Sequence, residues 1–229
     1  MDSNPIVDAL FKAGAQYGYS KSRRHPSVKK YIYTTRNQVD IIDVEATAMQ
    51  LEKALSFVSD LAKSGKKILF VGVKPEAKDL VKNAAESIGA PFVTERWVGG
   101  VLTNQREIKK RIAKLEDLKK KKESGELEKY TKKERLLIDE EIANMHKLFS
   151  GLVGFSGNPD ALFVIDPKRE HIAVTEAKKT RVPIIALANS DCNITGIQFP
   201  IIANDASMSS IGYFVEAVVS TYKNATKQA

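Results

Sequence analysis

Cysteine, histidine and long apolar runs are all scarce in this chain of 229 residues. The single cysteine, Cys192, cannot form a disulfide within the chain, and a reducing compartment is the simplest setting. The three histidines lie far apart without ligand spacing, so we expect no metal and no cofactor. The apolar runs, such as residues 68–71, are far shorter than the roughly 20 residues that a membrane helix needs.

The first ten residues hold two aspartates and lack a basic cluster followed by an apolar stretch. This composition is not that of a secretory signal. We therefore expect a cytoplasmic protein that is not associated with a membrane.

Catalytic signatures are also missing. There is no Walker loop and no Gly-x-Ser-x-Gly elbow, and the glycine-rich residues 151–157 follow a helical pattern rather than a strand. Asp166 follows a predicted strand, but with Pro167 behind it we interpret it as a helix cap. We expect no enzyme, although an α/β enzyme that uses the carboxyl edge of its sheet stays open as one alternative.

What the chain does have is an uneven distribution of positive charge. Lys and Arg number 36 against 28 Asp and Glu, which gives a net charge of +8. Residues 12–36 alone carry seven of these cations and no acidic residue. A solvated loop with a chance bias would explain this, but a loop that binds RNA phosphates explains it better. Within this segment, we expect Tyr17 and Tyr19 to pack against other side chains rather than to stack on RNA bases.

Short β-rich runs alternate with helical patterns through most of the chain. The helical stripes, which follow steps of three and four, cover residues 48–62, 77–88, 170–180 and 208–222. Strands that are apolar on both faces, separated by helices, indicate a parallel sheet between two helical layers. Five strands fit, at residues 39–42, 68–71, 91–94, 161–165 and 183–187.

Residues 103–150, called the arm below, contain no β-rich run and hold 14 basic and 10 acidic residues. Two heptad-like stripes flank a turn at residues 123–126, and Thr131 with Glu134 forms a capping box. The pattern predicts an antiparallel helical hairpin, a coiled-coil arm, inserted into an α/β body at residues 1–102 and 151–229. Residues 1–37 of that body would be a short helix, near 6–13, and the basic loop. Trp97, just before the arm, is predicted to be a packing anchor. A scaffold that binds proteins through the arm is a second alternative.

Several blocks of the chain resemble one known family, that of small ribosomal subunit protein two in its bacterial form. Two blocks are specific: Arg96-Trp-Val-Gly-Gly-Val-Leu-Thr-Asn104 and Pro159-Asp-Ala-Leu-Phe-Val-Ile-Asp166. The others are Lys12-Ala-Gly-Ala-Gln-Tyr-Gly18, Arg23-Arg-His-Pro26, Ile68-Leu-Phe-Val-Gly-Val-Lys74, Thr131-Lys-Lys-Glu134 and Ala203-Asn-Asp-Ala206, followed by Ser210-Ile211.

The resemblance implies a three-layer, flavodoxin-like or Rossmann-like α/β domain with a protruding helical hairpin. It also implies a structural constituent of the small subunit that binds ribosomal RNA and neighbouring ribosomal proteins, among them ribosomal protein one. His25 would hydrogen-bond or stack, and Lys74 and Arg96, beside motif blocks at strand ends, are secondary RNA contacts. The residues expected to neutralise phosphates are Lys21, Arg23, Arg24, Lys29, Lys30 and Arg36.

The chain also departs from the family pattern. Gln16-Tyr17-Gly18-Tyr19 stands where the family has His-Phe-Gly-His, so no histidine role carries over there. Residues 189–194 lack the family's Asp-Thr-Asn-x-Asp-Pro block, and Ser209 replaces an arginine.

Overall fold

Five parallel strands form the central sheet of the computed structural model, which describes residues 5–155 and 157–227. Every residue of β4, β6 and β7 is buried, as their uninterrupted apolar runs predict. The spatial order is β5-β4-β6-β7-β8. The strands are β4 (Ile68–Val71), β5 (Phe92–Val93), β6 (Ala161–Ile165), β7 (Ile184–Ala188) and β8 (Phe199–Ile202).

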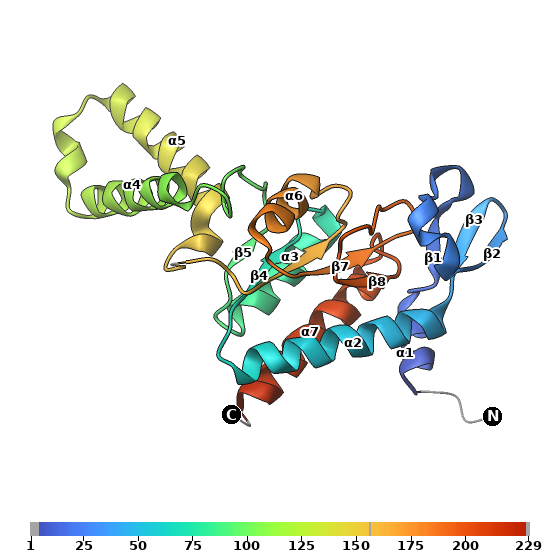
Figure 1. Cartoon of the computed structure of the whole chain (residues 1–229). Coiled ribbons are helices and arrows are strands. Elements are labelled where there is room, and N and C mark those ends of the chain that lie inside the picture. Colours follow the sequence, from blue (N-terminus) through green and yellow to red (C-terminus); the bar gives the residue numbers. More distant parts are fainter. Residues whose placement is uncertain (1–4, 156, 228–229) are drawn as a thin grey trace.

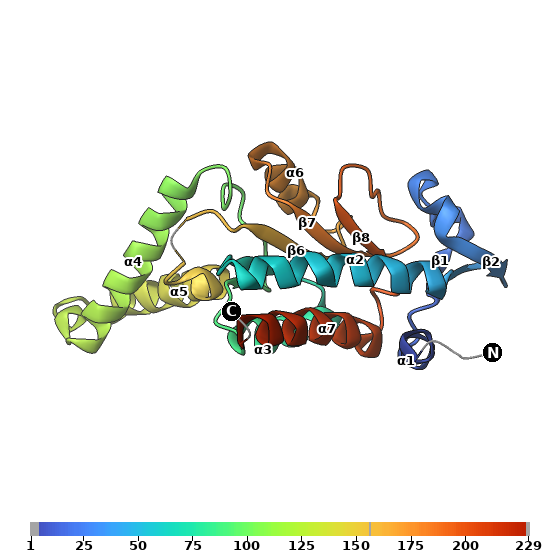
Figure 2. The same ribbon diagram turned by 60° about the horizontal axis from the view of Figure 1, so that its bottom comes forward.

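Helices cover both faces of this sheet (Figures 1 and 2), which confirms the predicted α/β class. Alternate strand residues point to opposite faces, so Phe70 and Phe163 lie in one core while Leu69 and Leu162 lie in the other. The first core is closed by α1 (Pro5–Ala13), α2 (Val44–Lys63), α3 (Pro75–Glu86) and α7 (Met208–Lys227), and the second by α6 (His171–Thr180) and the base of the arm.

The basic segment is not the loop that its composition suggests. It forms a small antiparallel sheet of order β1-β3-β2 with two short 3₁₀ helices. Asn37 and Gln38, both at positive φ (48° and 64°), make the tight turn between β2 and β3. We call residues 17–42 the N-terminal module: β1 (Tyr17–Ser20), η1 (Lys21–Arg23), η2 (Pro26–Tyr31), β2 (Ile32–Arg36) and β3 (Val39–Ile42).

Two further predictions about single elements are wrong. Residues 39–42 belong to the N-terminal module and not to the parallel sheet, whose fifth strand is β8. Asp166 does not cap a helix, because α6 begins only at His171. Asp166 instead has a φ of 60° and accepts a hydrogen bond from the Arg169 amide at 3.1 Å in a turn.

The arm consists of α4 (Gln105–Glu123), η3 (Glu126–Lys129) and α5 (Lys132–Phe149), with η4 (Ser150–Leu152) at its return to the body. The capping box is confirmed, since Thr131 and Glu134 exchange both hydrogen bonds. The apolar stripes meet near the body, where Leu115 and Phe149 are buried, whereas Leu136 and Leu137 on α5 are exposed. A coiled coil is therefore not confirmed.

The arm and the N-terminal module lie at opposite ends of the molecule, beyond β5 and β8 respectively (Figures 1 and 2). Among the described residues, no helix is long and apolar enough to span a membrane.

Candidate nucleic-acid interface

An internal ion pair holds the N-terminal module together. The guanidinium of Arg24 grips Asp40 with two hydrogen bonds, of which Nε to Oδ2 measures 2.6 Å, and it also donates to Thr35 at 2.7 Å. Asp40 is fully buried, and the hydrogen bond from Arg24 lowers the pKa of its carboxyl. Arg24 therefore serves first as the counter-ion of Asp40.

His25 joins the module to the edge of the parallel sheet. Its backbone amide donates to the Ser190 carbonyl at 2.9 Å, just after β7. Its ring Nδ1 accepts from the Ser27 amide at 3.2 Å and so caps η2. The half-buried imidazole thus shapes the loop that carries the neighbouring cations.

Five of the predicted phosphate ligands are exposed on the module and make no ion pair among the described residues. Two of them lie over tyrosine rings: Arg23 is 5.2 Å from the ring centre of Tyr19, and Lys30 is 4.8 Å from that of Tyr31. Because no carboxylate in the described part of the chain pairs with these cations, they are available to bind phosphates. The five are Lys21, Arg23, Lys29, Lys30 and Arg36.

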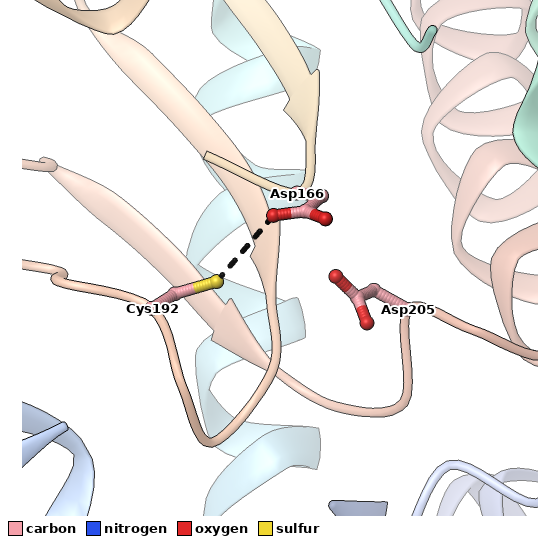
Figure 3. A group of neighbouring side chains, drawn as sticks. All are labelled: Asp166, Cys192 and Asp205. Atoms are coloured by element: carbon pink, nitrogen blue, oxygen red, sulfur yellow. Dashed lines mark hydrogen bonds between the residues drawn. The ribbon is translucent and has the colours of Figure 1, made fainter. Parts of the chain in front are cut away.

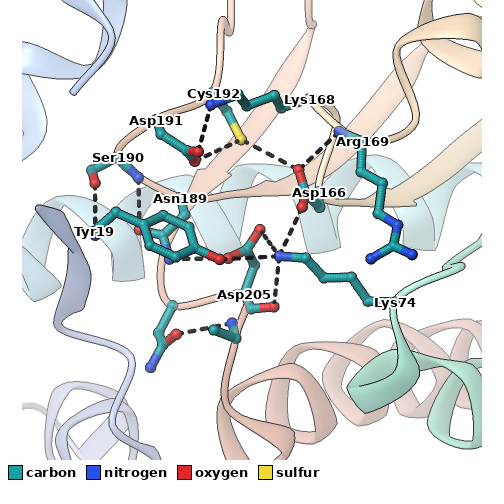
Figure 4. Close-up of polar contacts among 12 residues, drawn as sticks. Tyr19, Lys74, Asp166, Lys168, Arg169, Asn189, Ser190, Asp191, Cys192 and Asp205 are labelled. Atoms are coloured by element: carbon teal, nitrogen blue, oxygen red, sulfur yellow. Dashed lines mark hydrogen bonds and ion pairs between the residues drawn. The ribbon is translucent and has the colours of Figure 1, made fainter. Parts of the chain in front are cut away.

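Arg96 and Lys74 lie in contrasting places. Arg96 is exposed in the turn after β5, which is the strand at the opposite edge of the parallel sheet from β8. Lys74, at the end of β4, is only 7% exposed. Its ammonium lies 2.7 Å from Asp205 Oδ2 and 2.8 Å from Asp166 Oδ2 (Figure 4). Burial alone would lower the pKa of Lys74, but the charges of the two carboxylates raise it. This lysine is saturated by protein partners.

We call Lys74, Asp166 and Asp205 the sheet-edge cluster, and its position matters for function. The connection from β4 leads through α3, which packs in the first core, and the connection from β6 leads through α6, which packs in the second. Ligands of open α/β sheets bind at the carboxyl ends of the strands at this reversal. Lys74 follows β4 and Asp166 follows β6, so their ion pair fills the place where an enzyme of this class would hold its substrate.

The carboxylates of the sheet-edge cluster, together with Cys192, are also poorly suited to bind a metal ion. The ligand atoms of Asp166, Cys192 and Asp205 lie within 4.8 Å of one another (Figure 3). However, the ammonium of Lys74 already supplies a positive charge to both carboxylates. Burial raises the pKa of the Cys192 thiol, whereas metal ligation needs the thiolate. The residues present fit an internal ion pair better than a metal.

The sheet-edge cluster also contacts the N-terminal module. The Tyr19 hydroxyl lies 3.5 Å from the Lys74 ammonium, and the Tyr19 amide donates to Ser190 Oγ at 2.9 Å (Figure 4). Asn189 donates to Asp205 at 3.0 Å. The module that carries the exposed cations is thus fixed to the sheet edge by polar contacts.

Glu176 of α6 organises the turn that leads into the arm. Its carboxylate accepts from the Trp97 indole at 3.2 Å and from the amides of Gly100, Leu102 and Thr103 at 2.8 to 3.2 Å. Burial opposes ionisation, but these hydrogen bonds lower the pKa of Glu176 overall. Trp97 is 5% exposed, so its predicted packing role is correct. No local pattern points to Glu176, because its partners are more than 70 residues away along the chain.

Glu170, just before α6, predicts a dependence of stability on pH. It is 5% exposed, and burial raises its pKa to about 7. The folded state therefore holds this proton to higher pH than the unfolded state, and stability is lost as pH rises from about 4.5 to 7. Urea unfolding measures this effect. We expect the free energy of unfolding of Glu170→Gln, relative to that of the wild type, to increase by about 2 kcal/mol between pH 5 and pH 8.

Glu52 is exposed, so Glu52→Gln is the control for this measurement. Its free energy of unfolding should stay within about 0.5 kcal/mol of the wild-type value at both pH values. A stability difference between Glu170→Gln and the wild type that is the same at both pH values would contradict the raised pKa of Glu170.

Comparison with known proteins places the chain in a family. The family model described as "Ribosomal protein S2" matches residues 10–225. A relative from Spiroplasma citri, named "Small ribosomal subunit protein uS2", is 39% identical over 218 residues, which are 95% of this chain and 61% of the relative. A relative of the same name from Dehalococcoides mccartyi (strain 195) is 38% identical over 205 residues, or 90% of this chain and 84% of the relative. This chain thus spans less than two thirds of the Spiroplasma relative. The chain belongs to the ribosomal protein S2 family.

Proposed function

We propose that this protein is a structural constituent of the small ribosomal subunit, where it binds ribosomal RNA and neighbouring proteins without catalysis. The names of its relatives support a place in the small subunit, and the exposed cations of the N-terminal module support RNA binding. The ion-paired Lys74 at the sheet edge speaks against a substrate site. The proposed location is the ribosome in the cytoplasm.

The single observation that carries the RNA assignment is the group of five exposed cations that have no carboxylate partner within residues 5–155 and 157–227. These five contact phosphates in our proposal, and Arg96 adds a distant contact. Arg24, whose side chain is 18% exposed, and His25 hold the shape of the module. Lys74 acts through Tyr19 and the sheet edge rather than by touching RNA.

A second surface of the module suits a protein neighbour. Phe11, Tyr17 and Tyr33 are 50%, 53% and 79% exposed, and all three line one hollow between α1 and the small sheet. Asp43 and Glu45 also line it and outnumber its one cation, the proposed phosphate ligand Arg36 at the rim that the hollow shares with the RNA surface, so the hollow itself disfavours phosphates. An exposed aromatic patch of this kind marks a protein contact, and we propose that another small-subunit protein covers it, with ribosomal protein one as the first candidate.

Sedimentation tests the proposed function. Tagged protein is expressed in cells, and the lysate is fractionated on a sucrose gradient at near-physiological salt. We expect the protein to travel with the small subunit and to be released progressively as salt is raised, because phosphate contacts are salt-sensitive. A protein that stays at the top of the gradient at near-physiological salt would contradict the proposed function.

A further inference from the structure

A hollow beside β8 extends the cationic surface of the N-terminal module. It has a volume of about 830 Å³ and lies where η2, α2, and residues 194–200 meet. That volume falls within the range of roughly 300 to 1,000 Å³ of pockets for small organic groups. We call it the β8 hollow, and its lining includes Lys30, Gln50, Lys53, Phe57 and Phe199.

The cations of the β8 hollow come from two distant parts of the chain. Lys30 belongs to η2 of the module, and Lys53 belongs to α2; both are exposed. Neither makes an ion pair within the described part of the chain, and Asp60 is the one acidic residue of the lining. The hollow therefore has the charge to receive a phosphate, and Lys30 makes it continuous with the proposed RNA surface.

The rest of the lining fits a base rather than a bare phosphate. Phe57 and Phe199 stack at 4.3 Å between ring centres, and both are half-buried at the hollow. Gln50 accepts from the Ile202 amide at 2.8 Å through Oε1, whereas its Nε2 is buried and has no hydrogen-bond partner among the described residues. Unpaired RNA bases are held by aromatic faces and by hydrogen bonds to their edges.

We propose that the β8 hollow binds one unpaired nucleotide of the ribosomal RNA. Lys30 and Lys53 neutralise its phosphate, and the Phe57 and Phe199 rings contact its base. On binding, the buried Nε2 of Gln50 becomes a donor to the base edge. This inference rests on the proposed function, and it adds Lys53 and Gln50 to the RNA-binding residues. The N-terminal module would then bind phosphates, and the β8 hollow would bind one unpaired base.

The test combines an affinity measurement with base probing. The purified full chain is bound to RNA extracted from small subunits, and the dissociation constant is measured by filter binding from 50 to 300 mM salt. We expect Lys53→Glu to weaken binding about tenfold at moderate salt and to reduce the salt slope by about 1. Gln50 supplies a milder variant, Gln50→Leu, which should leave the salt slope unchanged because it removes no charge.

Lys63→Glu is the matched control, because Lys63 is exposed on the same helix about 15 Å further along. It makes the same charge change and should alter affinity less than twofold. Dimethyl sulfate should react with one unpaired adenine or cytosine that the wild type and Lys63→Glu protect and that Lys53→Glu exposes. Equal thermal midpoints of the variants would show that all are folded.

The outcomes separate the two proposals. A wild type that does not bind the RNA would count against the proposed function itself. A wild type that binds, with Lys53→Glu and Lys63→Glu indistinguishable in affinity and protection, would overturn the β8 hollow alone. Normal RNA affinity of Lys53→Glu with poor entry into small subunits would assign the hollow to a protein neighbour and also overturn the inference.

Discussion

Replacing Lys21, Arg23 and Lys29 together by glutamate should weaken binding to small-subunit RNA roughly a hundredfold at moderate salt and lower the salt slope by about 2 to 3. The three side chains are exposed, and none of them makes an ion pair among the described residues, so their reversal spares the fold. Arg24 is left unchanged, because a glutamate there would face the buried Asp40 and unfold the module. Filter binding across salt concentrations measures the effect.

The control for this triple variant reverses Lys63, Lys66 and Lys223, which are exposed near the ends of α2 and α7. Each reversal changes the charge by two, so both variants fall from +8 to +2. If RNA binding depended only on net charge, the two variants would bind equally weakly. We expect the control to lose no more than a few-fold in affinity, and equal losses would contradict the assignment of the N-terminal module.

The sheet could be predicted where burial is complete on both faces. Residues 68–71 and 161–165 are unbroken apolar runs, and both are fully buried strands. The last strand was missed because Pro200 interrupts Phe199, Ile201 and Ile202. Proline is tolerated there because β8 is the edge of the parallel sheet, where one side needs no ladder hydrogen bonds.

The distribution of charge predicts where the N-terminal module lies in the sequence but not which structure it adopts. Seven cations without an acid identify an interface, but glycines, serines and a proline in the same residues favour a loop. The buried pair of Arg24 with Asp40 stabilises the module, and β3 therefore buries Asp40 while Val39 is exposed, the reverse of what their polarity predicts. A single sequence does not show which of seven cations has an internal partner.

The sheet-edge cluster shows the same limit for Lys74. A lysine at a strand end is ordinarily exposed, which favours a ligand contact in any sequence-based prediction. Its partner Asp205 lies 131 residues away and reaches it only because β4, β6, β7 and β8 end at one edge of the sheet. Topology, and not local spacing, decides that this cation is internal.

Replacing Lys74 by methionine should therefore cost far more stability than a surface ion pair would. The change leaves Asp166 and Asp205 facing each other, 9% and 0% exposed, without the ammonium that neutralises them. Breaking a buried pair in this way costs about 3 to 5 kcal/mol, because an uncompensated charge remains inside. Urea unfolding at pH 7, followed by circular dichroism, measures the loss.

Three companion measurements identify the cause of that loss. Lys78→Met removes a partly exposed pair between Lys78 of α3 and Glu95, which follows β5, and it should cost less than about 1 kcal/mol. Adding Asp205→Asn to Lys74→Met should recover part of the stability, since one of the two facing charges is gone. Lowering the pH should narrow the gap between Lys74→Met and the wild type, because a proton then replaces the missing ammonium. A loss that neither Asp205→Asn nor acid relieves would mean that Lys74 stabilises the fold through packing of its stem and not through its charge.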